Sequence, residues 1–208
     1  MKSDAVNGFD RLAPHYDWLA RMIFGQSIVR AQTCFLGLIP PFSTVLILGG
    51  GTGWLLAELL EGRPESEVWY IESSASMLSM AMEKNKDHRQ VHFILGTEKD
   101  IPSREFDIVI APFFLDLFSP LTLQKVVERI SLASKPSAQW MIADFVNQGK
   151  WWQFLLLKTM YSFFRQVCGI EAHALPPWRA ILVQSGLTIV DRRFYYGGFI
   201  ESALYLKP

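Results

Sequence analysis

A glycine-rich segment, VLILGGGTG at residues 45–53, carries the clearest chemical signal in this 208-residue chain. It follows a short apolar run and precedes residues with helical spacing, which predicts a strand, a loop and a helix. Glycines there let the backbone approach a ligand closely, and the helix N-terminus adds N–H donors and partial positive charge. The segment therefore predicts a site for a nucleotide-like ligand. A dinucleotide fingerprint needs a glycine where this chain has Trp54, which disfavours a pyrophosphate.

A carboxylate stands where such a ligand would place its ribose. Glu72 ends a second apolar run in the sequence, after the glycine loop. A carboxylate at the end of the second strand can accept hydrogen bonds from both hydroxyls of a ribose. NAD and S-adenosylmethionine both have a ribose with a free 2'-hydroxyl, so the spacing leaves both open. The ordinary alternative is a solvated acid at the end of a strand.

Metal chemistry has little support in the sequence. His88 and His92 stand four apart, a spacing that binds zinc when both side chains lie on one helical face. The apolar run from Val91 instead predicts a strand that contains His92, with His88 in the preceding loop. No other cluster of ligand-type residues is seen in the sequence, and no metal site is expected.

The elements that must position the glycine loop and Glu72 alternate along the chain. Strands are expected at Thr44 to Leu48, Val68 to Glu72, Val91 to Leu95, Phe106 to Ala111, Gln139 to Phe145, Leu187 to Tyr196 and Phe199 to Leu206. Helices are expected between them, around Leu55 to Leu60, from Ser74 to Lys84, and from Pro120 to Leu132 with Ser119 as N-cap.

This alternation predicts an α/β fold with a doubly wound, mostly parallel seven-stranded sheet, because each crossover must return across the sheet. Gly197 and Gly198 join the last two strands directly, which predicts a C-terminal antiparallel hairpin. A helical N-terminal extension is expected from Phe9 to Leu38, with Asp10 and Ser27 as N-caps. We interpret residues 1–208 as one domain, in which residues 1–40 form the extension.

Composition bounds the possible functions. Half of the residues are hydrophobic, which supports a large core, and the 20 basic residues balance the 20 acidic ones. A nucleic-acid partner is therefore not expected. Cys34 and Cys168 form no disulfide framework and the N-terminus lacks a signal peptide, so a cytoplasmic location is expected. Residues 31–57 carry no charge, but Pro40 and Pro41 argue against a transmembrane helix.

Several motifs together give the chain a family resemblance. It resembles the class I S-adenosylmethionine-dependent methyltransferases, especially the branch related to ubiquinone and menaquinone biosynthesis, with a Rossmann-like fold. The similarity covers essentially the whole chain. It rests on FDRLAPHYD at 9–17, VLILGGGTG at 45–53, IESSASML at 71–78, FILGTEKDIP at 93–102, FDIVIAPFFLDLF at 106–118 and the terminal hairpin.

The resemblance implies S-adenosylmethionine as cofactor and assigns roles to particular residues. The methionine part of the cofactor would lie against the glycine loop, Glu72 would hold the ribose, and Tyr16 would close over the ligand. The remaining implied contacts are Gly49, Gly51 and Gly53 with the methionine part, Ser73, Met77, Thr97 and Glu98 with the adenine, and the backbone of Pro112 with the amino-acid part.

Two positions depart from the family pattern. The family usually has an acid two residues before its first motif glycine, where this chain has Ile47, and often has Asp where this chain has Thr97. Each lost charge-assisted hydrogen bond would cost roughly 1.5 to 3 kcal/mol. Thr97 keeps a hydroxyl, and Glu98 offers a shifted carboxylate. Ile47 offers no replacement, and we interpret it as a core residue.

Methyl transfer needs mainly positioning, because the sulfonium leaving group is already activated. A base is needed only where the acceptor must lose a proton early. The candidates are His15 and Tyr16 in the N-terminal motif and His173 in the loop EAHALPP. A lone histidine in a loop is more often a solvated surface residue. Asp116 is a further candidate, although an acid at a helix start explains it equally well.

Residues 150–167 predict an inserted amphipathic helix. Lys150, Lys158 and Arg165 form one basic stripe, and the opposite arc is apolar. Its members are Trp152, Leu156, Leu157, Met160, Phe163, Phe164 and Val167. Such a helix either packs on its own domain, lines an apolar acceptor pocket, or contacts a membrane surface weakly. We expect it over the cleft with the basic stripe outside.

The leading hypothesis is S-adenosylmethionine-dependent methyl transfer to a small, apolar or aromatic acceptor. The alternative is a binding or regulatory protein of the same fold that lacks transferase activity, suggested by Ile47 and Thr97. A nicotinamide-dependent oxidoreductase is a third hypothesis, opposed by Trp54 and the terminal hairpin. The acceptor, the methylated atom and the oligomeric state are not determined by the sequence.

Overall fold

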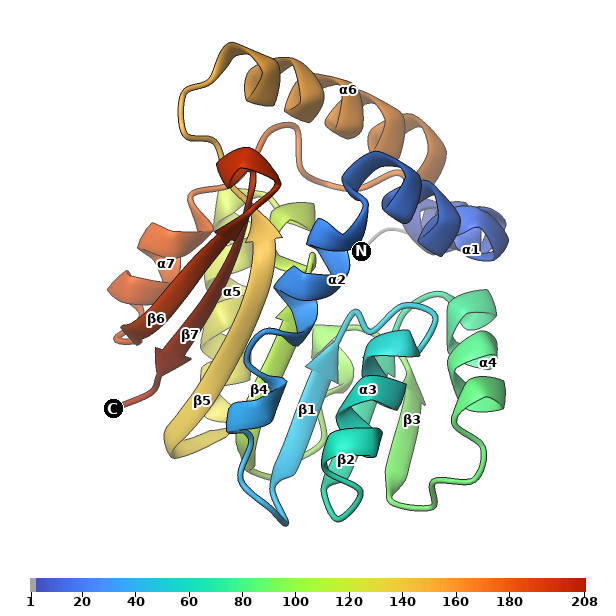
Figure 1. The fold of residues 1–208 in the computed structure, drawn as a ribbon, viewed down its shortest axis with the longest axis vertical. Coiled ribbons are helices and arrows are strands. Elements are labelled where there is room, and N and C mark those ends of the chain that lie inside the picture. The colour runs from blue at the N-terminus through green and yellow to red at the C-terminus, as the bar shows by residue number, and fades with distance from the viewer. Residues whose placement is uncertain (1–2) are drawn as a thin grey trace.

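A seven-stranded sheet forms the centre of the computed structural model, which describes residues 3–208 (Figure 1). The strands are β1 (Thr44–Leu48), β2 (Glu67–Glu72), β3 (Val91–Leu95), β4 (Phe106–Pro112), β5 (Ser134–Phe145), β6 (Thr188–Tyr195) and β7 (Ile200–Leu206). Their order is β3-β2-β1-β4-β5-β7-β6. All neighbours pair in parallel except β7, which is antiparallel to both β5 and β6. The predicted fold and hairpin are therefore confirmed.

Helices cover both faces of this sheet. On one face α3 (Trp54–Gly62) and α4 (Ala75–Lys84) pack against the strands, and on the other α5 (Pro120–Leu132) and α7 (Trp178–Gln184) do. The side chain of Ser119 caps α5 by accepting from the backbone N–H of Thr122, and Pro120 opens the helix, as predicted. The short helix α7 was not predicted.

The central strands are buried on both sides, which explains their continuous apolar character. In β1, Leu46 and Leu48 belong to the core beneath α5 and α7, whereas Val45 and Ile47 belong to the core beneath α3 and α4. Successive side chains of a strand point to opposite faces, so neighbours in sequence serve different cores. Leu48 therefore points to the face covered by α5 and α7, whereas Ile47 points to the face covered by α3 and α4.

The N-terminal segment corrects two predictions. It forms α1 (Ser3–Phe24) and α2 (Gln26–Thr33), followed by a short 3-10 turn, η1 (Leu36–Leu38). Asp10 lies inside α1 and therefore does not cap it. Gly25, with a φ of 57°, precedes α2, so Ser27 is an internal residue of α2 and not its N-cap. Gly25 has a left-handed backbone conformation and separates the two helices. A residue with a side chain would be strained in this conformation.

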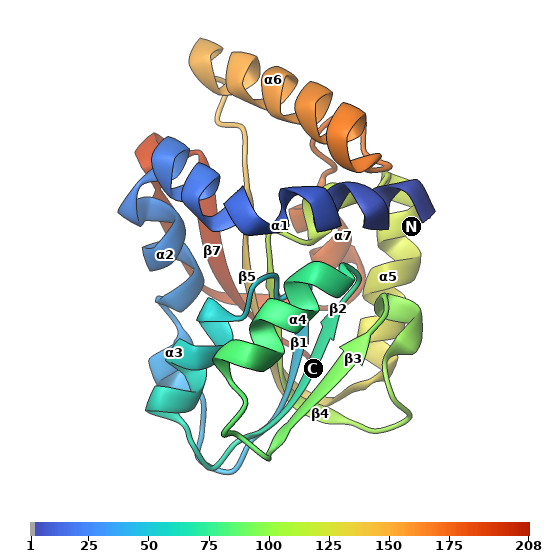
Figure 2. The same cartoon turned by 90° about the vertical axis from the view of Figure 1, so that its right-hand side faces the viewer.

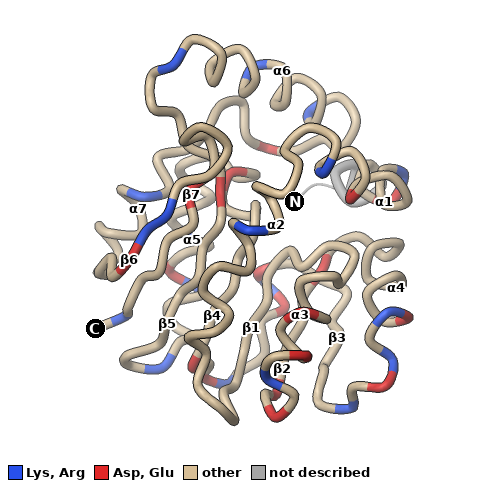
Figure 3. The backbone as a smooth tube through the Cα atoms, in the orientation of Figure 1, with Lys and Arg blue, Asp and Glu red and all other residues tan. Residues whose placement is uncertain are grey.

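The helix α6 (Trp151–Cys168) crosses the end of the molecule toward which β1 points (Figure 1). Figure 2 shows α1 beneath α6, with both helices above the strands. We call α1 and α6 together the roof. The charged positions on α6 are basic (Figure 3), and Lys158 and Arg165 are exposed as expected. Within residues 3–208, no helix has the length and apolar character needed to cross a membrane.

Candidate active site

A cavity of about 320 Å³ lies under the roof, at the carboxyl ends of β1, β2 and β4. One end of it is polar and the other is apolar. The polar end is lined by Gly49, Gly51, Glu72, Ser73, Thr97, Glu98 and Pro112. The apolar end is lined by Phe9, Leu19, Ile23, Phe113, Phe145, Leu156, Met160, Phe163 and Phe164, and the ring of Phe114 lies beside Gly49 between the two ends. The glycine loop and the apolar arc of α6 therefore line the same cavity.

The three glycines named from the sequence have different surroundings. All have positive φ, from 65° at Gly49 to 83° at Gly53. A Cβ at Gly51 would meet nothing within 4 Å, so its backbone borders open space in the cavity. A Cβ at Gly53 would lie 2.6 Å from the Cα of Ala81. Gly53 does not line the cavity and instead lets α3 begin against α4.

Glu72 is buried at the cavity, with 6% of its surface exposed. One of its carboxylate oxygens, Oε2, accepts from the N–H of Gly51 at 3.0 Å, and Oε1 accepts from the N–H of Ser74 at 2.8 Å. Burial raises the pKa of Glu72, and these N–H groups oppose that rise. Oε1 also accepts from the Ser73 hydroxyl at 3.5 Å, so the lone pair that remains for a ribose hydroxyl is on Oε2.

The remaining residues implied for the cofactor also line the cavity, namely Tyr16, Ser73, Met77, Thr97, Glu98 and Pro112. The Thr97 hydroxyl accepts from the N–H of Lys99 at 3.3 Å, which caps the 3-10 turn η2 (Glu98–Asp100). Its own N–H donates to Asp100 at 2.8 Å. The Thr97 hydroxyl also donates to the Asp100 carboxylate at 3.4 Å, so its hydrogen and one of its lone pairs are used in local structure.

Two aspartates of the N-terminal motif attach α1 to the loops below it. The Asp10 carboxylate accepts from the Ser74 hydroxyl at 2.6 Å and from the N–H of Ser76 at 2.9 Å, so it caps α4 from another helix. The Asp17 carboxylate accepts from the Thr52 hydroxyl at 2.5 Å. Both aspartates lie on one face of α1, about two helical turns apart. That spacing is the sequence signal that would have found this role.

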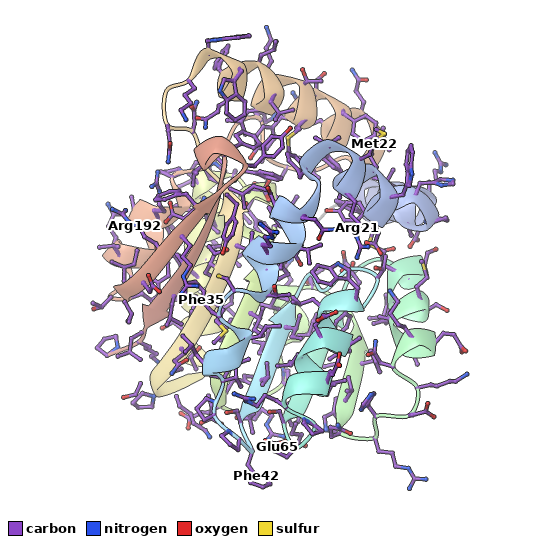
Figure 4. All side chains as sticks on the ribbon, in the orientation of Figure 1. Arg21, Met22, Phe35, Phe42, Glu65 and Arg192 are labelled. Atoms are coloured by element: carbon purple, nitrogen blue, oxygen red, sulfur yellow. The ribbon has the colours of Figure 1, made fainter. Side chains whose placement is uncertain are left out.

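A cation–π contact adds to the attachment of α1. The guanidinium of Arg21 lies 6.0 Å from the ring centroid of Trp54, at the start of α3. Figure 4 places Arg21 and Met22 on α1, at the end of the molecule that α6 covers, and Phe42 and Glu65 at the opposite end. The cavity therefore lies at the end of the sheet that α1 closes.

The structure separates the three residues considered as bases. Tyr16 lines the cavity, but burial and the negative charges of Asp116 and Asp17 raise its pKa, so it stays protonated and can donate a hydrogen bond. His15 is exposed and does not line the cavity. His173 is also exposed, beside Glu171 in a separate surface depression. The two histidines are not brought to the cavity.

Ile47 has an entirely apolar environment. It is fully buried and belongs to the core cluster of Leu55, Leu56 and Tyr70, on the side of the sheet that faces α3 and α4. It does not line the cavity. This agrees with the interpretation of Ile47 as a core residue.

The apolar arc of α6 divides into two parts. Leu156, Met160, Phe163 and Phe164 line the cavity. Trp152 does not, because its ring packs against the terminal hairpin, 5.8 Å from the ring centroid of Phe199. The other end of α6 touches α1 closely, where a Cβ at Gly8 would lie 2.2 Å from the Cα of Cys168. These contacts hold α6 at both ends over the cavity.

Sequence reasoning undervalued a pair of buried acids at the cavity. Asp116 lies in the 3-10 turn η3 (Leu115–Leu117) rather than at a helix start, and it lines the cavity with 6% exposure. Asp144 is fully buried at the end of β5, and its Oδ2 accepts from the N–H groups of Leu115 and Asp116 at 3.1 and 3.2 Å. An acid within the apolar run QWMIADFV was the available signal.

The two histidines that stand four apart do not share a helical face. His92 lies in β3, where its Nε2 is 2.9 Å from Glu67 Oε1, and His88 lies in the preceding loop. Across residues 3–208 no group of three or more metal-ligating side chains comes together. The cavity therefore presents hydrogen-bonding and apolar groups.

Comparison with known proteins gives similar sequences and folds. Residues 45–137 match the family model described as a methyltransferase domain. The chain is 34% identical over 122 residues to demethylmenaquinone methyltransferase from Thermotoga maritima. That match covers 57% of this chain and 52% of the relative, so the aligned part spans about half of the relative's length.

Two solved structures share the fold over most of the chain. One is a complex of a methyltransferase with the Trm112 methyltransferase activator from Haloferax volcanii, with a TM-score of 0.73, 16% identity and coverage of 96% of this chain and 97% of that one. The other is the N-methyltransferase NodS from Bradyrhizobium japonicum WM9 with S-adenosyl-L-homocysteine. Its TM-score is 0.64 at 14% identity, and the match covers 87% of this chain and 84% of that one.

Proposed function

Because residues 45–137 match a methyltransferase domain and the chain is similar to a demethylmenaquinone methyltransferase, we propose that it is a class I S-adenosylmethionine-dependent methyltransferase that transfers a methyl group to a small, apolar or aromatic acceptor. The observation that carries this proposal is the single cavity with a polar end at the glycine loop and an aromatic end beneath α6. The polar end suits a nucleoside with an amino-acid tail, and the aromatic end suits an acceptor with little polar surface.

Glu72, Gly49 and Gly51 would hold the cofactor, as the family resemblance implies. The open space over Gly51 and the remaining lone pair on Oε2 of Glu72 support this assignment. S-adenosylmethionine supplies an activated methyl group when it is bound. Ser73, Met77, Thr97, Glu98 and Pro112 complete the proposed contacts at the same end of the cavity, with Tyr16 donating from above.

The aromatic end supports an acceptor with a large apolar surface. Burial of apolar area contributes about 25 cal/mol per Å² removed from water, which favours aromatic or quinone-like molecules over sugars or nucleotides. The name of the Thermotoga maritima relative gives demethylmenaquinone as its substrate, and a compound of that class is our first choice of acceptor.

Membrane contact would be weak, since Lys158 and Arg165 offer about 1 kcal/mol each near an anionic surface.

The roof would serve mainly to position the acceptor relative to the methyl group. Displacement at a methyl carbon needs the attacking atom in line with the breaking bond, and a well-oriented pair of reactants removes most of the entropic barrier. Phe113, Phe114 and Phe163 would confine an aromatic ring against the methyl group and exclude water. The φ of 50° at Phe113 is a strained conformation for a non-glycine residue at the cavity wall.

Calorimetry and a methylation assay test the proposal together. S-adenosylhomocysteine should bind with one site per chain, and tritiated S-adenosylmethionine should label hydroxylated naphthoquinones or naphthols but not sugars. Binding without labelling of any acceptor would favour the alternative of a regulatory protein that has lost transfer. Absence of cofactor binding would overturn both assignments.

A further inference from the structure

We propose that Asp116 is the general base of this site and that it takes the proton from a hydroxyl group of an aromatic acceptor. This inference rests on the proposed methyl transfer and deepens it, because it assigns the acceptor a phenol- or enol-type hydroxyl. It arises from the position of Asp116 between the aromatic end of the cavity and the buried Asp144.

Four other titratable side chains line the cavity, and none of them is as well placed to act as a base. Glu72 accepts two backbone N–H groups, and Glu98 lies 3.8 Å from the guanidinium of Arg129. Tyr16 and Tyr161 are held protonated, because burial and nearby carboxylates raise their pKa values. Among the residues that the structure describes, Asp116 is then the lining group best able to accept a proton.

The carboxyl of Asp116 has a free oxygen. Its Oδ1 is buried and has no hydrogen-bond partner in the described structure. Buried polar atoms normally have a partner, and an exception at a cavity points to a ligand that supplies one. A hydroxyl of the acceptor would donate to this oxygen. The apolar surroundings make that hydrogen bond stronger than it would be in water.

The surrounding elements hold Asp116 in place. Asp144 accepts from two successive backbone N–H groups of η3, including that of Asp116. From the roof, the Tyr161 hydroxyl donates to the main-chain oxygen of Asp116 at 3.2 Å. Asp144 and Tyr161 are thus positioning residues, and they fix the turn that carries the base from two opposite sides.

The protonation of Asp116 suits this role. Burial raises its pKa to about 7, so the carboxyl exchanges a proton near neutral pH. The titratable groups that interact with Asp116 are Asp144 on β5, Tyr161 on α6 and Tyr16 on α1. Asp17 on α1, Glu72 on β2 and Cys168 on α6 in turn raise the pKa of Tyr16.

The proposed step balances in atoms and charge. The acceptor's O–H proton passes to the Asp116 carboxylate, and the oxygen forms a bond to the methyl carbon. The bond from that carbon to sulfur breaks, and its electron pair stays on sulfur. Asp116 afterwards releases the proton to water. No oxidant or reductant is involved.

A pH-dependent binding experiment with 1-naphthol tests this assignment. With S-adenosylhomocysteine present, ionised Asp116 should accept from the naphthol hydroxyl, so affinity should rise about tenfold between pH 6 and pH 8. Asp116→Asn should lower the affinity at pH 8 about tenfold and remove its pH dependence. The matched control is Glu171→Gln, an exposed acid outside the cavity, which should behave as wild type.

The outcomes separate this inference from the proposed function. Failure of wild-type protein to bind S-adenosylhomocysteine would overturn the methyltransferase proposal itself. Normal binding of S-adenosylhomocysteine, together with naphthol affinity that is unchanged in Asp116→Asn, would overturn only the role of Asp116. So would a wild-type protein that binds no naphthol at any pH.

Turnover and spectroscopy give two further readouts. For any naphthol that is methylated, Asp116→Asn should lower kcat at least about 100-fold, the usual range for a lost general base. If that variant does not fold, carboxyl carbon NMR of wild-type protein labelled at aspartate replaces it. A carboxyl signal that titrates near pH 7 and shifts when naphthol is added supports the assignment, and the lack of any such signal overturns it.

Discussion

The carboxylate of Asp17 accepts a hydrogen bond from the hydroxyl of Thr52 at 2.5 Å, and this contact joins the roof directly to the glycine loop. Thr52 lies between Gly51 and Gly53, so the backbone that borders the proposed cofactor site is held by a side chain of α1. The N-terminal motif thereby controls how firmly the loop is covered.

Loss of this contact should speed release of the cofactor product. Thr52→Val keeps the size of the side chain but removes the donor, so α1 should open more readily. We expect S-adenosylhomocysteine to dissociate about 3 to 10 times faster, as for the loss of one hydrogen bond worth about 1 kcal/mol. Stopped-flow fluorescence measures the rate. Thr33→Val is the control, because the Thr33 hydroxyl bonds only within α2. Equal rates in both variants would contradict this role of Thr52.

Glu72→Ala should weaken binding of S-adenosylhomocysteine by roughly 1.5 to 3 kcal/mol through loss of charge-assisted hydrogen bonds to the ribose. Isothermal calorimetry measures this change, and a melting curve checks that the glycine loop survives the loss of its own bond to Glu72. Glu67→Gln is a suitable control on the same strand, since Glu67 contacts His92 rather than the cavity. Unchanged affinity in a folded Glu72→Ala protein would remove Glu72 from the site.

Ile47→Asp should destabilise the fold and should not tighten cofactor binding. The side chain packs among buried apolar residues on the face of the sheet away from the cavity, where a carboxylate has no partner. Burying an unpaired charge costs at least about 3 kcal/mol, whereas Ile47→Val should cost about 1 kcal/mol. Urea unfolding compares the two variants. Tighter binding of S-adenosylhomocysteine by Ile47→Asp would show that the carboxylate reaches the site after all.

Asp116 should reduce stability at neutral pH. Its pKa is raised by burial to about 7, so the folded state binds a proton that the unfolded state has already released between about pH 4 and pH 7. The contribution of this group to stability is greatest below pH 4 and falls as pH rises through 7. Asp116→Asn should therefore be more stable than wild type at pH 8, by about 1 to 3 kcal/mol, with a smaller difference at pH 4. Equal differences at both pH values would contradict the raised pKa.

Local sequence determined most of the sheet. β1 and β3 have the predicted bounds, because each is a short apolar run with clear ends, and Ser119 with Pro120 identified the start of α5. β5 begins at Ser134 rather than Gln139, since its polar first residues pair only through tertiary contacts. The helix α7 has seven residues and follows two prolines, too little for a periodic pattern.

The site was harder to predict where its residues contact partners that lie far away in the sequence. Glu72 and the glycines were found because their role follows from one strand–loop–helix unit. Asp10 resembles an N-cap of its own helix and instead caps α4, which only the packing of α1 reveals. Asp116 and Asp144 come from separate strands' ends, and their proximity depends on the pairing of β4 with β5.

The close contact between Gly8 and Cys168 has a consequence for folding. It joins segments that lie far apart in the chain, whereas the sheet core is built from neighbouring strand–helix units. Such distant contacts form late, because their loop-closure entropy must be overcome first. We therefore expect the amide protons of α1 and α6 to exchange with solvent together, through a partial opening that leaves the sheet intact. Substrate would then enter and product leave when α1 and α6 separate, which reverses the contact that forms last during folding.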